Sequence, residues 1–157
     1  MRGLKLAHFG GLVIFLGSIL TFIVISALIE GASLDNIAFG RKIISTGTNL
    51  LTLPGMWVLA ITGMWMGYQR YGIKQRFFQI KLLLITLIVV NAHLFIAPAV
   101  ASATELATRS LAQGRFLPEY QAAYLQESIY GAVNVLLAVA AAVVGVWKVG
   151  SRPLKQR

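Results

Sequence analysis

Two histidines are the side chains of this sequence best suited to bind a metal ion or to move protons. His8 and His93 both lie inside long segments that contain no Asp, Glu, Lys or Arg. An ionisable side chain among apolar residues is a candidate for function, because its burial has to be compensated. Histidine is also a usual axial ligand of haem iron. We therefore take His93 and His8 as candidate metal ligands.

Other side chains could complete such a site. Met56 and Asn134 lie near the middle of their segments, as His93 does, so a haem held by His93 and Met56 is one arrangement, with Asn134 as a hydrogen-bonding partner. In the alternative, His93 and Asn134 bond to each other and hold two helices together. His8 lies nearer one end, about 14 Å from His93 in depth at about 1.5 Å per residue, which disfavours one iron shared by both histidines. No catalytic triad or phosphate-binding loop occurs, so catalytic residues stay unknown.

The segments that carry these residues are long enough to cross a membrane. A helix of about 20 apolar residues spans a bilayer core of about 30 Å, and backbone groups in lipid must be paired internally. The composition agrees, with 57% hydrophobic and 12% charged residues and a mean hydropathy of +0.75. We predict an all-α, four-transmembrane-helix up-down bundle that forms a single membrane domain over residues 1–157. Its spans are the four uncharged runs, residues 6–29, 43–69, 82–104 and 128–147.

The charges are distributed unevenly between the two sides of such a bundle. Fourteen Lys and Arg and five Asp and Glu give a net charge of +9. One side receives ten basic residues and no acid, and the positive-inside rule makes this side cytoplasmic. We predict a multi-pass protein of the bacterial inner membrane with both termini cytoplasmic and the 105–127 connection outside. The ten residues are Arg2, Lys5, Arg70, Lys74, Arg76, Lys81, Lys148, Arg152, Lys155 and Arg157; the other side holds Glu30, Asp35, Arg41, Lys42, Glu105, Arg109, Arg115, Glu119 and Glu127.

Composition also narrows the partners. The basic residues are scattered in short groups between apolar runs, so we expect no nucleic acid as a partner. The chain has no cysteine, which excludes disulfides, thiolate metal sites and iron–sulfur clusters. The expected partners are the lipid bilayer and other membrane helices, through self-association or in a larger complex.

Glycine and proline mark how the helices pack. Glycines that share a helix face let membrane helices approach closely, and they could also leave room for a flat cofactor. Pro54 and Pro98 each remove a helical hydrogen bond and predict a kink. Trp57 is too deep for an interface anchor and is expected in the core. The glycines in question are Gly3, Gly10 and Gly17 in the first segment and Gly47, Gly55, Gly63 and Gly67 in the second.

Three short motifs resemble a group of small bacterial membrane proteins. They are Lys-Leu-Ala-His-Phe-Gly-Gly at 5–11, Leu-Pro-Gly-Met-Trp-Val-Leu-Ala-Ile-Thr-Gly at 53–63, and Ile-Lys-Leu-Leu-Leu at 80–84, followed by His93. The group includes HemJ-type protoporphyrinogen oxidases, copper-resistance-D-like domains and uncharacterised membrane proteins. The resemblance implies binding of b-type haem, with His8, Lys81 and His93 as the functional set.

Two functions are therefore carried forward. The first is binding of haem b, or a related tetrapyrrole, for a redox role, which would include a haem-dependent oxidoreductase. The second is that of a non-catalytic subunit or assembly factor whose helices dock those of a larger membrane complex. The uncharged segments contain no acid, which counts against a proton or cation transporter of the carboxylate kind.

Overall fold

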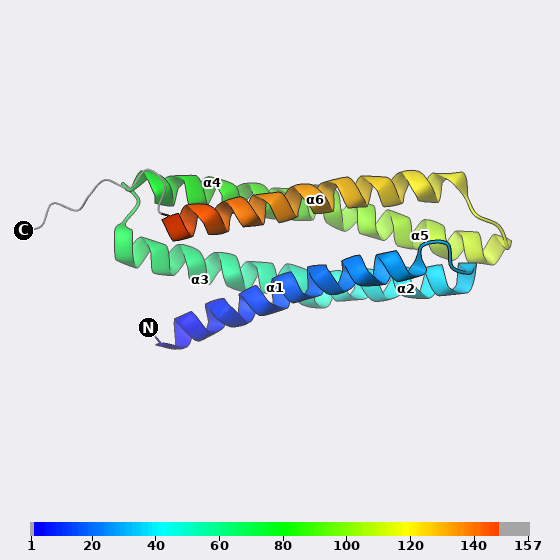
Figure 1. Ribbon diagram of the computed structural model, residues 1–157, viewed down its shortest axis with the longest axis horizontal. Coiled ribbons are helices and arrows are strands. Elements are labelled where there is room, and N and C mark those ends of the chain that lie inside the picture. The colour runs from blue at the N-terminus through cyan, green and yellow to red at the C-terminus, as the bar shows by residue number, and fades with distance from the viewer. Residues whose placement is uncertain (1, 148–157) are drawn as a thin grey trace, which may run out of the picture.

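The computed structural model describes residues 2–147, which are almost entirely helical. Two pairs of helices are continuous through a short π-helical turn, so the chain folds as four long helices, and the described residues contain no strand (Figure 1). The all-α fold is thereby confirmed. The elements are α1 (Arg2–Ile29), α2 (Leu34–Gly47), η1 (Thr48–Thr52), α3 (Leu53–Tyr71), α4 (Arg76–Asn91), η2 (Ala92–Ile96), α5 (Ala97–Gln113) and α6 (Pro118–Trp147).

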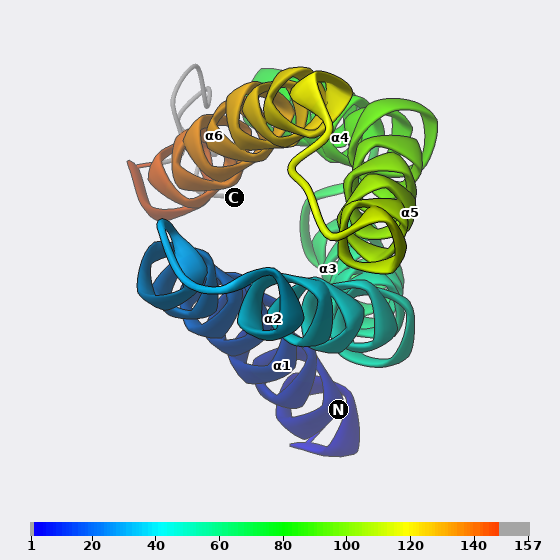
Figure 2. The same cartoon turned by 90° about the vertical axis from the view of Figure 1, so that its right-hand side faces the viewer.

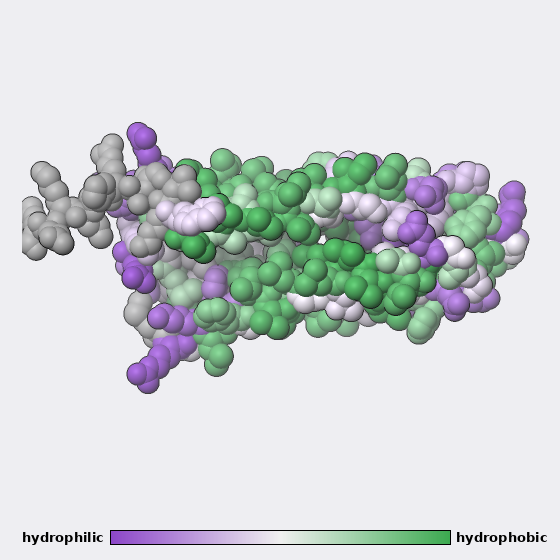
Figure 3. Space-filling view, in the orientation of Figure 1, coloured by the Kyte–Doolittle hydropathy of each residue, from purple (hydrophilic) through white to green (hydrophobic). Residues whose placement is uncertain are grey.

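All four long helices are long and apolar enough to cross a membrane. In Figure 3 apolar residues cover the middle of the molecule, and hydrophilic residues gather at its two ends. The ends of α1 and α6 at Arg2 and Trp147 lie beside the 72–75 connection, which we call the basic end (Figure 1). The 30–33 and 114–117 connections lie at the other end, which carries the acidic residues and which we call the acidic end. The basic tail predicted to be cytoplasmic, from Lys148 to Arg157, lies outside the described residues.

The helices continue well beyond the predicted spans, so the predicted connections are too long. The 70–81 connection shrinks to residues 72–75, and the 105–127 connection to residues 114–117. At the acidic end the added turns bury a small hydrophobic core of their own. This packing stabilises the helices beyond the segments that lipid would surround. This core consists of Ile37, Ala103, Ala107, Tyr120 and Ala123.

Both prolines follow a π-helical turn rather than interrupting a helix. The turn Thr48–Thr52 comes directly before α3, where Pro54 is in the first turn, and Ala92–Ile96 comes before α5, where Pro98 takes the same place. Proline lacks an N–H and its ring clashes with the carbonyl four residues earlier, and a wider turn accommodates both effects. The helices therefore remain continuous past their prolines.

The glycines predicted to pack against other helices do so in the second segment but not in the first. Gly11 and Gly55 allow α1 and α3 to cross with their backbones nearly touching, because a Cβ at Gly11 would lie 2.9 Å from the Leu59 nitrogen. All four glycines predicted in the second segment are likewise packed against another helix. The first-segment glycines contact no other helix of the described chain, since a Cβ at Gly10 or Gly17 would meet nothing within 4 Å. Gly10 lies on the outer face of α1, whereas the next residue, Gly11, lies on the face that packs against α3.

The bundle is closed on three sides only. The helix α1 packs on α2 and α3, and α6 packs on α4 and α5, while α1 and α6 hardly touch each other. The view along the bundle shows how the four long helices are arranged around one another (Figure 2). We call the open side between these two helices the α1–α6 seam. Both cavities described below lie along it.

Candidate functional site

A cavity of about 370 Å³ lies in the basic-end half of the bundle, between α1, α3, α4 and α6. Ligand sites in proteins typically have volumes of about 300–1,000 Å³. Its walls are apolar except for His8 and Lys81, and Met56 forms part of one wall. Three of the five residues predicted for a cofactor site thus share one cavity, which we call the His8 cavity. The other two, His93 and Asn134, are not among its lining residues.

A hydrogen-bond chain holds the imidazole of His8 in one tautomer. The Thr62 hydroxyl donates to the Val58 carbonyl oxygen over 2.6 Å, so its proton is committed. The 2.9 Å contact between His8 Nδ1 and Thr62 Oγ1 is therefore a bond donated by Nδ1–H. The lone pair is then on Nε2, which is the atom that a metal or a hydrogen-bond donor would use. A hydrogen bond of this kind is typical of metal-binding histidines, whose ring it orients.

The ammonium group of Lys81 lies at the same cavity without a counter-ion. Lys81 is half-buried, and within residues 2–147 neither of the two ion pairs involves it. The sequence places it in a predicted connection, whereas the structure places it in the second turn of α4, facing the bundle interior. Apolar walls with an imidazole and one unpaired cation suit an amphipathic ligand that carries an anionic group.

Two glycines make room for these side chains. A Cβ at Gly63 would lie 2.9 Å from the His8 Cε1 atom, and a Cβ at Gly145 would lie 2.9 Å from the Lys81 Nζ atom. A real Cβ atom essentially never lies this close to another heavy atom, so any larger residue at either position would displace its partner. The glycine-lined face predicted in the second segment therefore accommodates the imidazole as well as another helix.

His93 lies on the outer surface, with both ring nitrogens already bonded. Its Nδ1 donates to the Val89 carbonyl oxygen over 3.1 Å, because a carbonyl can only accept. Its Nε2 then accepts the indole N–H of Trp57 over 3.4 Å, and the two rings meet edge to face. Trp57 is 42% exposed, so its expected place in the core is wrong. Neither nitrogen of His93 is left for iron in this arrangement, and the structure does not bring His93 together with Met56 or His8.

Asn134 is buried between α4 and α6, where it has a different partner from the one predicted. Its Oδ1 accepts a hydrogen bond of 3.2 Å from the Asn91 amide, which also donates to the Tyr130 carbonyl oxygen. The alternative of a direct bond between His93 and Asn134 is therefore wrong, although an interhelical polar bond does exist. Buried side-chain bonds between membrane helices typically contribute about 0.6–2 kcal/mol.

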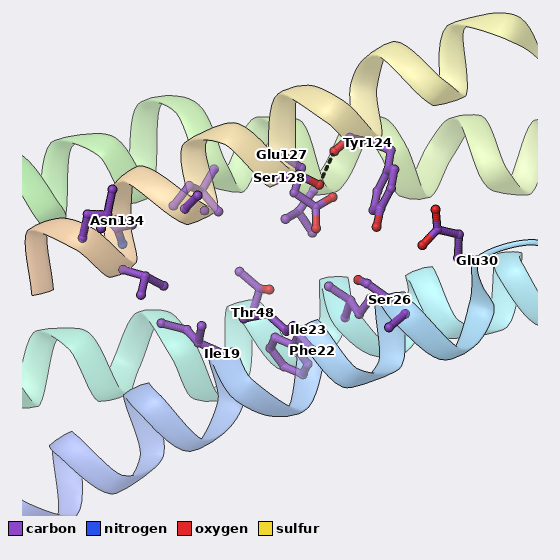
Figure 4. A pocket seen from close by; sticks show the side chains of 18 residues that line it. Ile19, Phe22, Ile23, Ser26, Glu30, Thr48, Tyr124, Glu127, Ser128 and Asn134 are labelled. Atoms are coloured by element: carbon purple, nitrogen blue, oxygen red, sulfur yellow. Dashed lines mark hydrogen bonds between the residues drawn. The ribbon is translucent and has the colours of Figure 1, made fainter. Parts of the chain in front are cut away.

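A second cavity, of about 650 Å³, lies along the seam toward the acidic end, and we call it the Glu30 cavity. The carboxylates of Glu30 and Glu127 and the ring of Tyr124 project into it, and Asn134 marks its inner end (Figure 4). The two cavities have only Val135 in common among their lining residues. The sequence analysis places these acids in connections and assigns them no role.

Arg41 is the most deeply buried charged residue of the described chain. Its side chain is fully buried and pairs with Glu127, whose side chain is 14% exposed. Its guanidinium also lies over the Tyr124 ring, 5.4 Å from the ring centroid, while its Nε and Nη1 atoms have no hydrogen-bond partner. The pair joins α2 to α6 across 86 sequence positions. Sequence reasoning missed it, since only spatial proximity reveals which of five acids faces this arginine.

Comparisons with known proteins give no information on function, so a functional proposal has to be argued from the fold and the two cavities. No protein-family model, curated protein or solved structure matches this chain. Within residues 2–147 no three His, Cys, Asp or Glu side chains converge as they would around a metal ion held by protein alone. A haem iron needs only one or two protein ligands.

Proposed function

We propose that this is a polytopic membrane protein that binds haem b, or a related tetrapyrrole, in the His8 cavity for a redox role. The observation that carries the proposal is the pairing of an oriented imidazole with an unpaired ammonium in an apolar cavity. His8 Nε2 would be the axial ligand, and Lys81 would bind a propionate carboxylate. Haem, when bound, would supply the one-electron chemistry. The choice of His8 over His93 rests on the free lone pair of His8.

The remaining residues of the cavity have roles that follow from their positions. Phe15, Met56 and Ile88 form a buried cluster that would contact the apolar faces of the ring. Met56 is only 2% exposed and lies on the neighbouring α3, so its thioether is placed to pack against the ring. The seam leaves one side of the cavity without a protein wall, because Val139 and Val146 are exposed there. A flat ligand could extend through this side toward the lipid.

The absorption spectrum tests the proposal. We expect protein purified in detergent after haem-replete expression to show a Soret band, and His8→Ala to lose it because the axial ligand is removed. Lys81→Gln should retain the band with weaker haem retention, since only the carboxylate contact is lost. His93→Ala is the matched control and should keep the spectrum. A wild-type protein without a Soret band, or a band that His93→Ala abolishes and His8→Ala preserves, contradicts the proposal.

A second candidate function is that of a subunit or assembly factor in a larger membrane complex. The outer face of α1 favours it, because Gly3, Gly10 and Gly17 have open space around them. A stripe of small residues is a usual contact surface for another membrane helix. This function predicts a colourless protein that co-purifies with other subunits and is unaffected by His8→Ala.

We also propose that the four helices run up and down across the bacterial inner membrane with both termini cytoplasmic. The proposal is supported by the uneven distribution of Lys and Arg, because the end of a membrane protein that is rich in these residues is usually cytoplasmic.

Single cysteines test this orientation, since the natural chain has none. Ile73→Cys and Phe116→Cys replace exposed apolar residues in the 72–75 and 114–117 connections without changing charge. In intact spheroplasts a membrane-impermeant maleimide should label only the cysteine at position 116, and both should react after lysis. Labelling of position 73 alone in intact spheroplasts would reverse the orientation.

A further inference from the structure

The Glu30 cavity carries its acidic groups at one end and is mostly apolar toward the other. Near the acidic end its lining includes Glu30, Ser26, Tyr124 and Glu127. Toward the middle of the bundle the lining is mostly aliphatic, with Thr48 and Asn134 as its polar residues. In Figure 4 the carboxylates of Glu30, which directly follows α1, and Glu127, from α6, enter the same space from opposite sides of the seam. A cavity built in this way fits a ligand with a polar head and an apolar body.

The charge of the polar end is negative. No Lys or Arg is among the residues that line the cavity, and Arg41 lies behind Glu127, fully buried. Glu30 and Glu127 contribute −2 and Arg41 contributes +1, which leaves a net charge of −1. Within the described residues neither of the two ion pairs involves Glu30. The ring of Phe22 also lines this cavity, and aromatic rings attract cations through their faces. The Tyr124 ring lines it too, but that ring already has the Arg41 guanidinium over it.

We propose that the Glu30 cavity binds a lipophilic cation, a molecule with a quaternary or protonated nitrogen, or an equivalent onium centre, on an apolar body. The Glu30 carboxylate, which is exposed at the mouth of the cavity, attracts the cationic head, and the aliphatic part of the cavity holds the apolar body. A zwitterionic phospholipid fits less well, because its phosphate would approach two carboxylates with the only guanidinium out of reach. The site is separate from the His8 cavity, so this inference does not depend on haem binding.

Binding of radiolabelled tetraphenylphosphonium tests the inference. The protein is placed in phosphatidylcholine nanodiscs, whose lipid carries no net charge, and empty nanodiscs give the background. We expect saturable binding that dodecylamine competes away and that tetraphenylborate, an anion of the same shape, does not. Glu30→Gln should weaken tetraphenylphosphonium binding about tenfold, because it removes the net charge of the site without touching the Arg41 pair.

Glu119→Gln is the matched control, since it makes the same change at an exposed acid at the same end but outside the cavity. It should leave the affinity unchanged. A circular dichroism spectrum that matches the wild type confirms that the Glu30→Gln protein is folded. Binding equal to that of empty nanodiscs, equal affinity for both ions, or equal effects of the two variants overturns the inference.

Discussion

Replacing Glu127 by glutamine is expected to lower the free energy of unfolding by about 3–5 kcal/mol, the range for breaking a buried ion pair by removing one partner. The reason is the position of Arg41, whose side chain is fully buried and has Glu127 as its only ion-pair partner in the described chain. Glutamine keeps the shape of the side chain but leaves the guanidinium charge uncompensated. The loss is measured by denaturant titration in mixed detergent micelles, followed by circular dichroism.

Two further variants separate charge burial from other effects. Glu105→Gln makes the same chemical change in the Glu105–Arg109 pair, which is more than 60% exposed on both sides. Exposed pairs typically contribute about 0–1 kcal/mol, so this variant should be close to the wild type. Replacing Arg41 and Glu127 together by leucine should recover most of the stability, because no buried charge remains. Equal losses in the free energy of unfolding for Glu127→Gln and Glu105→Gln would show that the buried pair contributes no more to stability than the exposed pair.

Adding one methyl group at Gly11 is expected to cost about 1–3 kcal/mol, the usual range for overpacking a close-packed site. A Cβ at this position would lie 2.9 Å from the Leu59 nitrogen and 3.1 Å from the Gly55 carbonyl oxygen. Both are backbone atoms of α3, which cannot turn away as a side chain can, so α1 must separate from α3. The expected loss in Gly11→Ala is measured by the same titration.

Gly10→Ala provides the control for this effect. The residue is the neighbour of Gly11 in the same helix, and a Cβ there would meet nothing within 4 Å. Alanine favours helix over glycine by about 1 kcal/mol, so Gly10→Ala should be neutral or stabilising while Gly11→Ala destabilises. If both variants behaved alike, the close crossing of α1 and α3 would not be an important source of stability.

The membrane-spanning parts of the helices are predictable from sequence, and their extensions are not. The uncharged runs mark the helix sections that can lie in lipid, and each of the four lies within one long helix. Charged residues such as Glu105 and Arg109 then suggest a connection. They are in fact on the exposed side of a helix whose other side buries Ala103 and Ala107. Hydropathy averages over both sides and therefore ends the helix too early.

The candidate site is predictable in its residue types but not in its grouping. His8, Met56 and Lys81 are identified from sequence, yet their common cavity depends on where three helices cross. Two contacts decide which histidine has a nitrogen available for a ligand. The Thr62 hydroxyl bonds to His8 Nδ1 and leaves Nε2, whereas the Trp57 indole donates to His93 Nε2. The Arg41–Glu127 pair depends on the packing of α2 on α5 and of α5 on α6. Such contacts between distant segments leave no periodic signal in a single sequence.

The open seam gives the bundle a mechanical property. The helices α1 and α6 are its two free edges, and hardly any protein contact limits the distance between them. In a bilayer the acyl chains press against these edges, so the lateral pressure of the lipid acts where a closed bundle would have a packed interface. We therefore expect the distance between α1 and α6, and with it the width of both cavities, to depend on the lateral pressure of the surrounding lipid.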